Sequence, residues 1–226
     1  MQSEVGYWKS LFSGTFKPRV PVRPYVPERR QMPPRFVPVT SAWKGIESVL
    51  ADLIAKFGIG RGRCLEFGVE QGYSTAALSC FFDSVTGVDT FVGDIHTTDH
   101  RDMYEETTNR LSAFENIQLV RSDYRDWIAK DNSFYDLIHV DIVHTYADTF
   151  ACGLWSANHS KCVIFHDTES FPTVKRAAIS IARDPSPALA AISRGLAVKR
   201  AVIDIARATN KKFYNFKECN GLGILV

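Results

Sequence analysis

Several familiar patterns are missing from this sequence of 226 residues. No apolar run is long enough to cross a bilayer, and the first ten residues lack the basic-then-apolar order of a signal peptide. The five cysteines include no Cys-x-x-Cys pair, which argues against a disulfide framework or a zinc site and favours core residues in a reducing compartment. Apolar residues make up 45% of the chain, enough for a packed core. We therefore expect a globular, cytoplasmic protein with no membrane partner.

The amino end differs in composition from the rest of the chain. Residues 1–40 carry seven Lys or Arg against two Glu, a net charge of about +5, whereas residues 41–226 carry twenty against twenty-three acidic residues, about −3. Seven of the ten prolines lie between Pro18 and Pro38, and four of them recur every third residue, as in polyproline II. This predicts a proline-rich basic arm over 1–40 and one domain over 41–226. The mildly acidic domain argues against a nucleic acid partner.

Three roles are open for the arm. Its proline spacing and interspersed arginines suit recruitment by a proline-reading partner. Its apolar residues Tyr25, Val26, Phe36 and Val37 suit docking on its own domain, or on a sister subunit of a homo-oligomer. We favour docking, because these side chains offer apolar anchors.

Strand-like and helix-like segments alternate along the domain. Strands are expected at 64–67, 84–89, 117–123, 134–141 and 161–167, followed by a hairpin of 212–218 and 222–226. Helices are expected at 42–57, 73–82, 101–114, 124–130 and 146–158, and the helical segments 174–183 and 198–207 are identical at eight of ten positions. The alternation predicts an α/β, Rossmann-like, doubly wound fold with a mostly parallel seven-stranded sheet and a C-terminal antiparallel hairpin.

A glycine turn follows the first of these strands. Its spacing is Glu-x-Gly-x-x-x-Gly, with Glu66, Gly68 and Gly72 at the defined positions, and Ser74 and Thr75 are candidate caps of the helix that follows. A strand, a tight turn and a helix N-terminus form a backbone cradle for a nucleoside cofactor. The spacing differs from the Gly-x-Gly-x-x-Gly of dinucleotide sites, and Glu66 suits a cationic group. The turn therefore favours S-adenosylmethionine.

Acidic residues follow the other strands. Asp89 ends the second strand about 20 residues after the turn, where a ribose-binding carboxylate belongs. Asp123, Asp141 and Asp167 follow the third, fourth and fifth strands. The carboxyl ends of parallel strands meet at one edge of a sheet, where open α/β sheets bind ligands. We therefore expect these acids to surround one cavity.

Two histidines accompany the acids of the fourth and fifth strands. Asp141, His144, His166 and Asp167 are expected to converge beside the cofactor as the catalytic residues. Asp141, His166 and Asp167 could hold Mg²⁺ and lower the pKa of an acceptor hydroxyl. Without a metal, His144 or His166 could act as a general base. Both alternatives stay open.

A loop with two more histidines follows the second strand. His96 and His100 are four apart, a spacing that suits zinc on a helix, but Gly93 and the nearby Thr and Asp residues favour a loop over the cofactor or substrate. Two rival functions follow from these observations. One is a metal hydrolase that uses these histidines with His144 and His166. The other is a non-catalytic, cofactor-binding or scaffold protein recruited through the proline-rich arm.

Four motifs together resemble a known family. They are EFGVEQGYST at 66–75, VDTFVGDIH at 88–96, IHVDIVHTY at 138–146 and FHDT at 165–168. On these the chain resembles class I S-adenosylmethionine-dependent methyltransferases, and most of all the methyltransferase family 24 group. The resemblance covers about 63–168 and resumes at 221–226. It implies an enzyme that methylates a hydroxyl of a small acceptor, a sugar or another small polar molecule.

The resemblance also implies roles for individual residues. Glu66, Gly68 and Gly72 would line the methionine part of the cofactor, Asp89 would bind the ribose, Ser122, Asp123 and Tyr124 would flank the adenine, and Asp141 would face the sulfonium. The full predicted cofactor-binding set is Glu66, Gly68, Gly72, Tyr73, Ser74, Asp89, Thr90, Ser122, Asp123, Tyr124 and Asp141. Related metal-dependent sugar O-methyltransferases place acids at the positions of Asp141 and Asp167. His166 departs from their pattern.

Overall fold

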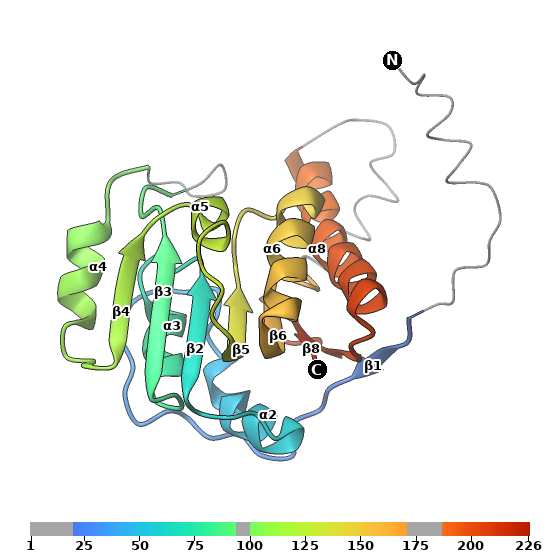
Figure 1. Cartoon of the computed structure of the whole chain (residues 1–226), viewed down its shortest axis with the longest axis horizontal. Coiled ribbons are helices and arrows are strands. Elements are labelled where there is room, and N and C mark those ends of the chain that lie inside the picture. Colours follow the sequence, from blue (N-terminus) through green and yellow to red (C-terminus); the bar gives the residue numbers. More distant parts are fainter. Residues whose placement is uncertain (1–19, 94–99, 171–186) are drawn as a thin grey trace.

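The structure, a computed structural model, describes residues 20–93, 100–170 and 187–226. Its strands form one mixed sheet of eight in the order β1-β7-β8-β6-β5-β2-β3-β4 (Figure 1). The strands are β1 Val22–Pro24, β2 Arg63–Phe67, β3 Ser84–Asp89, β4 Ile117–Arg121, β5 Tyr135–Val140, β6 Ser160–His166, β7 Phe213–Phe216 and β8 Leu222–Leu225. The helices are η1 Glu47–Val49, α2 Leu50–Phe57, α3 Tyr73–Ser79, α4 Tyr104–Leu111, α5 Tyr124–Ile128, α6 Tyr146–Asn158 and α8 Pro187–Thr209.

The sheet confirms the predicted architecture. Strands β2 to β6 pair in parallel, and β7 and β8 form the expected antiparallel hairpin, with β8 antiparallel to β6. The seven predicted strands are all present. The eighth, β1, comes from the arm and pairs in parallel with β7.

The central strands of the sheet are buried on both faces, because a layer of helices packs on each face and forms a hydrophobic core with it. Successive residues of a strand point to opposite faces. On β5, Leu137 packs on the side of α2 and α3, whereas Ile138 packs on the side of α6 and α8. On β6, Cys162 and Val163 divide in the same way, and Cys64 and Cys162 are free, buried core residues as expected. Near-continuous apolar runs are what a parallel sheet with helices on both faces requires.

Residues 20–40 of the arm dock on the chain's own domain. Tyr25 and Val37 are 3% exposed and belong to the core on the side of α2. The carboxylate of Asp52 on α2 accepts hydrogen bonds from the Tyr25 hydroxyl at 2.7 Å and from the amides of Glu28 and Arg29 at 3.0 and 3.1 Å. Of the four predicted anchors, Tyr25 and Val37 are therefore confirmed, whereas Val26 and Phe36 are 70% and 58% exposed and were predicted wrongly. The division of the chain at residue 40 stays a prediction.

Two predictions about helices need correction, and one stays untested. The helix expected over 42–57 begins only at η1, because turns occupy 42–46. Helix α3 is capped by Gly72, with no capping side chain, so the prediction that Ser74 or Thr75 caps it was wrong. The second copy of the repeated segment lies within α8, and the first copy lies outside the described residues. Among the described helices, none is long and apolar enough to span a membrane.

Candidate active site

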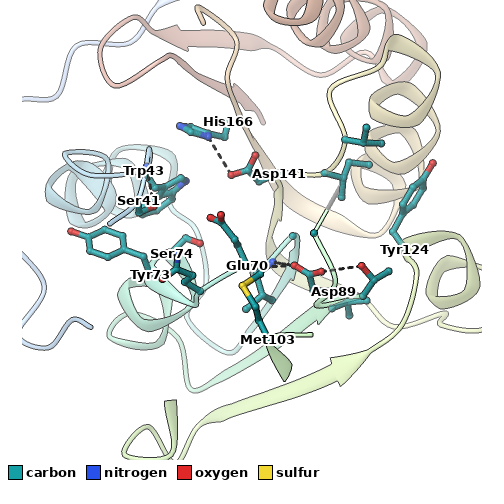
Figure 2. A pocket seen from close by; sticks show the side chains of 18 of the residues that line it. Ser41, Trp43, Glu70, Tyr73, Ser74, Asp89, Met103, Tyr124, Asp141 and His166 are labelled. Atoms are coloured by element: carbon teal, nitrogen blue, oxygen red, sulfur yellow. Dashed lines mark hydrogen bonds and ion pairs between the residues drawn. The ribbon is translucent and has the colours of Figure 1, made fainter. Parts of the chain in front are cut away.

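A cavity of about 570 Å³ opens at the carboxyl edge of the sheet. Ser41, Trp43, Tyr73 and Ser74 lie along one side of it, and Asp89 and Tyr124 lie along the opposite side (Figure 2). Asp141 and His166 close the end between these two sides. The volume lies in the range of small-molecule and cofactor sites.

The cavity gathers most of the predicted site residues. All four predicted catalytic residues line it, and so do nine of the eleven predicted cofactor-binding residues. The exceptions are Glu66 and Gly72, which do not line it. Parallel strands thus bring their carboxyl ends to one rim, as the sequence predicted.

The glycine turn must come very close to the neighbouring strand. Gly68 has φ +90°, and a Cβ placed on it would lie 1.8 Å from the carbonyl oxygen of Asp141. Gly72 has φ +83°, and its Cβ would meet the side chain of Leu111 at 2.7 Å. Only glycine suits both the left-handed backbone and this packing.

The Asp89 carboxylate, at the end of β3, stabilises the glycine turn through hydrogen bonds to its backbone. One of its oxygens accepts the amides of Val69 and Glu70, both at 2.8 Å, and the other accepts the amide of Phe91 at 2.8 Å. It therefore fixes two backbone segments that line the cavity. Its predicted contact with a ribose stays a prediction.

Glu66 lies beneath the cavity. It is completely buried, receives the Thr75 hydroxyl, and lies 2.9 Å from Nδ1 of His139. The sequence analysis correctly predicted that Glu66 lies at the end of a strand, but it did not predict the hydrogen bonds to Thr75 and His139. Conversely, Glu70 projects into the cavity from a backbone with φ +51° (Figure 2), and the sequence analysis did not assign it.

The adenine side of the predicted site is held by a carboxylate on α6. Asp148 accepts the Tyr124 hydroxyl at 2.7 Å and pairs with Arg125, and both partners line the cavity. Asp123 caps α5 by accepting the amide of Arg125 at 2.7 Å. Asp123 also lines the cavity.

The predicted catalytic residues form one network of acids and imidazoles. Nε2 of His144 lies 2.8 Å from Asp167 and 3.4 Å from Asp141. Nδ1 of His166 lies 3.2 Å from Asp141 and 3.7 Å from Asp167. Asp167 has φ +61°, a left-handed backbone that L residues adopt rarely and that is frequent at functional sites. Each acid thus faces both imidazoles.

These contacts shift the protonation of the network. Burial would lower the pKa of His144, but its hydrogen bonds to Asp141 and Asp167 outweigh burial and raise the pKa to about 10. Burial would likewise lower the pKa of His166, and the charge of Asp141 raises it. Burial would raise the pKa of Asp141, yet the charge of His166 and the hydrogen bond of His144 hold it well below its usual range. Near pH 7 the metal-free cluster therefore holds His144 as an imidazolium beside an ionised Asp141, which argues against the predicted role of His144 as a general base without a metal.

A divalent cation fits three members of this network. Within the described part of the chain, ligand atoms of Asp141, His144 and Asp167 lie within 4.8 Å of one another. His144 is thus a candidate ligand that the sequence analysis did not assign, and the predicted set of Asp141, His166 and Asp167 stays a prediction. Two carboxylates and one imidazole suit Mn²⁺ and, less ideally, Mg²⁺. A cation would compete with the proton of His144, so its binding would release that proton.

The described residues do not test the zinc alternative at His96 and His100, which the sequence analysis disfavoured. His100 is exposed, and His96 lies outside the described residues. The prediction of a loop over this stretch therefore stays untested.

Removing the His144 imidazole should change the pH dependence of folding stability in the metal-free protein. The folded-state pKa of about 10 exceeds the ordinary 6.5, so the stabilisation is complete below pH 6.5 and is lost as the pH rises through 10. We expect urea unfolding to show a large stability gap between the wild-type protein and His144→Gln at pH 6 and a much smaller gap at pH 10. A stability gap that is the same at both pH values would contradict the assignment of His144 as an imidazolium. Asp126→Asn serves as the control, because Asp126 is an exposed acid on α5.

Comparison with known proteins identifies the fold and the domain. Residues 65–168 match the family model of a methyltransferase domain. The chain carries a methyltransferase domain. This confirms the resemblance on which the motifs were interpreted, and the matched segment contains the glycine turn and all four residues of the acid and imidazole network.

Solved structures share the fold of the methyltransferase domain at low sequence identity. A protein from Staphylococcus aureus, assigned as a caffeoyl-CoA O-methyltransferase, has a TM-score of 0.60 at 16% identity and covers 84% of this chain and 85% of its own. An O-methyltransferase from Bacillus cereus in complex with SAH has a TM-score of 0.57 at 16% identity, with 84% of each chain covered. TomG from Streptomyces achromogenes, an O-methyltransferase of tomaymycin synthesis in complex with SAM, has a TM-score of 0.53 at 16% identity. The match covers 77% of this chain and 76% of TomG. No curated protein matches the chain.

Proposed function

We propose that this protein is an S-adenosylmethionine-dependent O-methyltransferase whose acceptor is a hydroxyl of a sugar or another small polar molecule. One observation carries the proposal: a single cavity joins the glycine turn and Asp89 to the network of Asp141, His144, His166 and Asp167. A nucleoside cofactor and a hydroxyl acceptor would thus meet within one cavity. The similar folds of methyltransferases bound to SAM or SAH support the choice of cofactor.

The arrangement suggests an orientation for the cofactor. The adenosine would lie between Asp89 and Tyr124, and the methionine end would lie toward Tyr73 and Ser74 on the other side of the cavity. The sulfonium would then lie near Asp141, which closes the end between the two sides. A carboxylate there would stabilise the positive sulfur and direct the methyl group toward the acceptor.

Methyl transfer needs alignment and an acceptor that gives up its proton. The acceptor oxygen attacks the methyl carbon in line as the bond from that carbon to sulfur breaks, which leaves a neutral thioether. Asp141 or Asp167 would accept the hydrogen bond of the hydroxyl and orient it. The single proton would pass to that carboxylate only as the bond to the methyl carbon forms, because the attacking oxygen then becomes strongly acidic. A divalent cation held by Asp141, His144 and Asp167 would supply a lower hydroxyl pKa at neutral pH.

Calorimetric titration with S-adenosylmethionine, with and without Mg²⁺ or Mn²⁺, tests the cofactor, and incubation with labelled cofactor and a panel of sugars tests the acceptor. We expect saturable binding at one site and label in a product ether. Absence of cofactor binding under every condition would refute the proposal.

Self-association through the arm, the cytoplasmic location and the lack of nucleic acid or membrane partners stay predictions.

A further inference from the structure

A buried relay of four polar side chains runs beneath the cavity. Nε1 of Trp43 donates to Nε2 of His139 at 3.2 Å, and Nδ1 of His139 lies 2.9 Å from Glu66, whose other oxygen accepts the Thr75 hydroxyl. Thr75, Glu66 and His139 are completely buried, and Trp43 is 2% exposed. No residue of the relay belongs to the acid and imidazole network, so the proposed chemistry leaves it unexplained.

The protonation of the relay follows from its donors. An indole nitrogen can only donate, so Nε2 of His139 must accept and the imidazole proton must reside on Nδ1. That proton then points at the Glu66 carboxylate, which also receives the hydroxyl proton of Thr75. A buried carboxylate is tolerated when donors compensate its lost hydration. Trp43, His139 and Thr75 are thus fixed in mutual orientation by one charge on Glu66.

The relay connects three separate parts of the cavity wall. Trp43 itself lines the cavity from the turns that precede η1, Glu66 lies two residues before Gly68, and Thr75 follows Ser74 on α3. Glu66 and His139 are register partners on β2 and β5, so their side chains share one face of the sheet. The wall that it ties together is the side on which Trp43, Tyr73 and Ser74 gather in Figure 2.

We propose that His139 and Glu66 are positioning residues that hold the methionine-end wall of the cavity in its binding geometry. Glu66 then acts on the cofactor through Thr75 and Trp43 without touching it. The inference rests on the proposed function for the identity and orientation of the cofactor. Its specific consequence is that the relay matters for a ligand with a methionine tail and not for the adenosine part alone.

Trp43→Phe tests the relay with the least disturbance, because it removes the indole donor, keeps an aromatic ring and leaves the pair of His139 and Glu66 intact. Trp155→Phe is the matched control: Trp155 stacks on His159 with ring centroids 4.2 Å apart, and it lies on α6 outside the cavity lining. Each full-length variant is titrated with S-adenosylhomocysteine and with adenosine. Thermal melting confirms that it is folded at the assay temperature.

We expect Trp43→Phe to weaken S-adenosylhomocysteine binding about tenfold, the effect of one buried hydrogen bond, and to leave adenosine binding within twofold. In turnover, KM for S-adenosylmethionine should rise by more than kcat falls. His139→Gln should weaken S-adenosylhomocysteine binding at least as much, and the double variant should bind no worse than His139→Gln, because both changes break one connection.

Equal losses for both ligands would mean a general loss of structure and would overturn the proposal. Unchanged binding of both ligands by Trp43→Phe would overturn it as well, and this variant decides the matter should His139→Gln not fold. A wild-type protein that binds neither ligand would instead refute the proposed function. Wild-type binding with no difference between Trp43→Phe and Trp155→Phe would refute the relay alone.

Discussion

Asp141→Asn should lower kcat for methyl transfer by about 1,000-fold while the protein still binds S-adenosylhomocysteine. The change keeps the shape of the side chain but removes the charge that faces His144 and His166 at 3.4 and 3.2 Å. It also removes a ligand of the candidate cation site. The measurement is turnover of labelled cofactor, combined with calorimetric titration of S-adenosylhomocysteine.

The same strand provides a matched control for Asp141→Asn. Asp136 lies near the start of β5 and accepts the amides of Gly62 and Arg63 at 2.9 and 3.1 Å, away from the cavity lining. Asp136→Asn should reduce stability slightly and leave kcat within a few-fold. Asp167→Asn should behave like Asp141→Asn, since Asn tolerates the left-handed backbone at Asp167. Turnover by Asp141→Asn at the wild-type rate would refute the assignment of this cluster.

Gly68→Ala should abolish cofactor binding and destabilise the fold by about 3 kcal/mol or more. The added Cβ would lie 1.8 Å from the carbonyl oxygen of Asp141, so either the turn or the end of β5 must move. Left-handed strain at φ +90° adds about 1–2 kcal/mol for an L residue. Because both displaced segments line the cavity, lost stability and lost binding should occur together. Urea unfolding and calorimetric titration measure the two effects.

Gly58→Ala separates backbone strain from the steric clash. Gly58 caps α2 with φ +60°, and a Cβ there would meet nothing within 4 Å. Its substitution should cost only the strain, about 1–2 kcal/mol, with cofactor affinity unchanged. Should Gly68→Ala prove no worse than Gly58→Ala, the close approach of the turn to β5 would not be a requirement of the fold.

Local sequence patterns were sufficient to place the sheet. Strand β6 contains the uninterrupted apolar run from Cys162 to Phe165, β5 is buried at every position but Asp136, and an acid follows each strand. Strand β1 was missed because its proline-rich segment lacks the apolar alternation of a strand, and it pairs only at the edge, where proline is tolerated. Helix η1 begins later than expected because the apolar period of 42–57 reflects burial of Trp43 and Ile46 in turns as well as in a helix.

The sequence by itself determined which residues reach the cavity rim. Segments that are buried on both faces form the parallel strands, and parallel strands bring Asp89, Asp141 and Asp167 to one edge. Only the tertiary structure decided the side-chain partners, because a hydrogen bond depends on orientation between segments far apart in the chain. The tertiary structure adds His144 to the candidate cation ligands, buries Glu66 against His139, and places Trp43, from the turns that follow the arm, in the cavity wall.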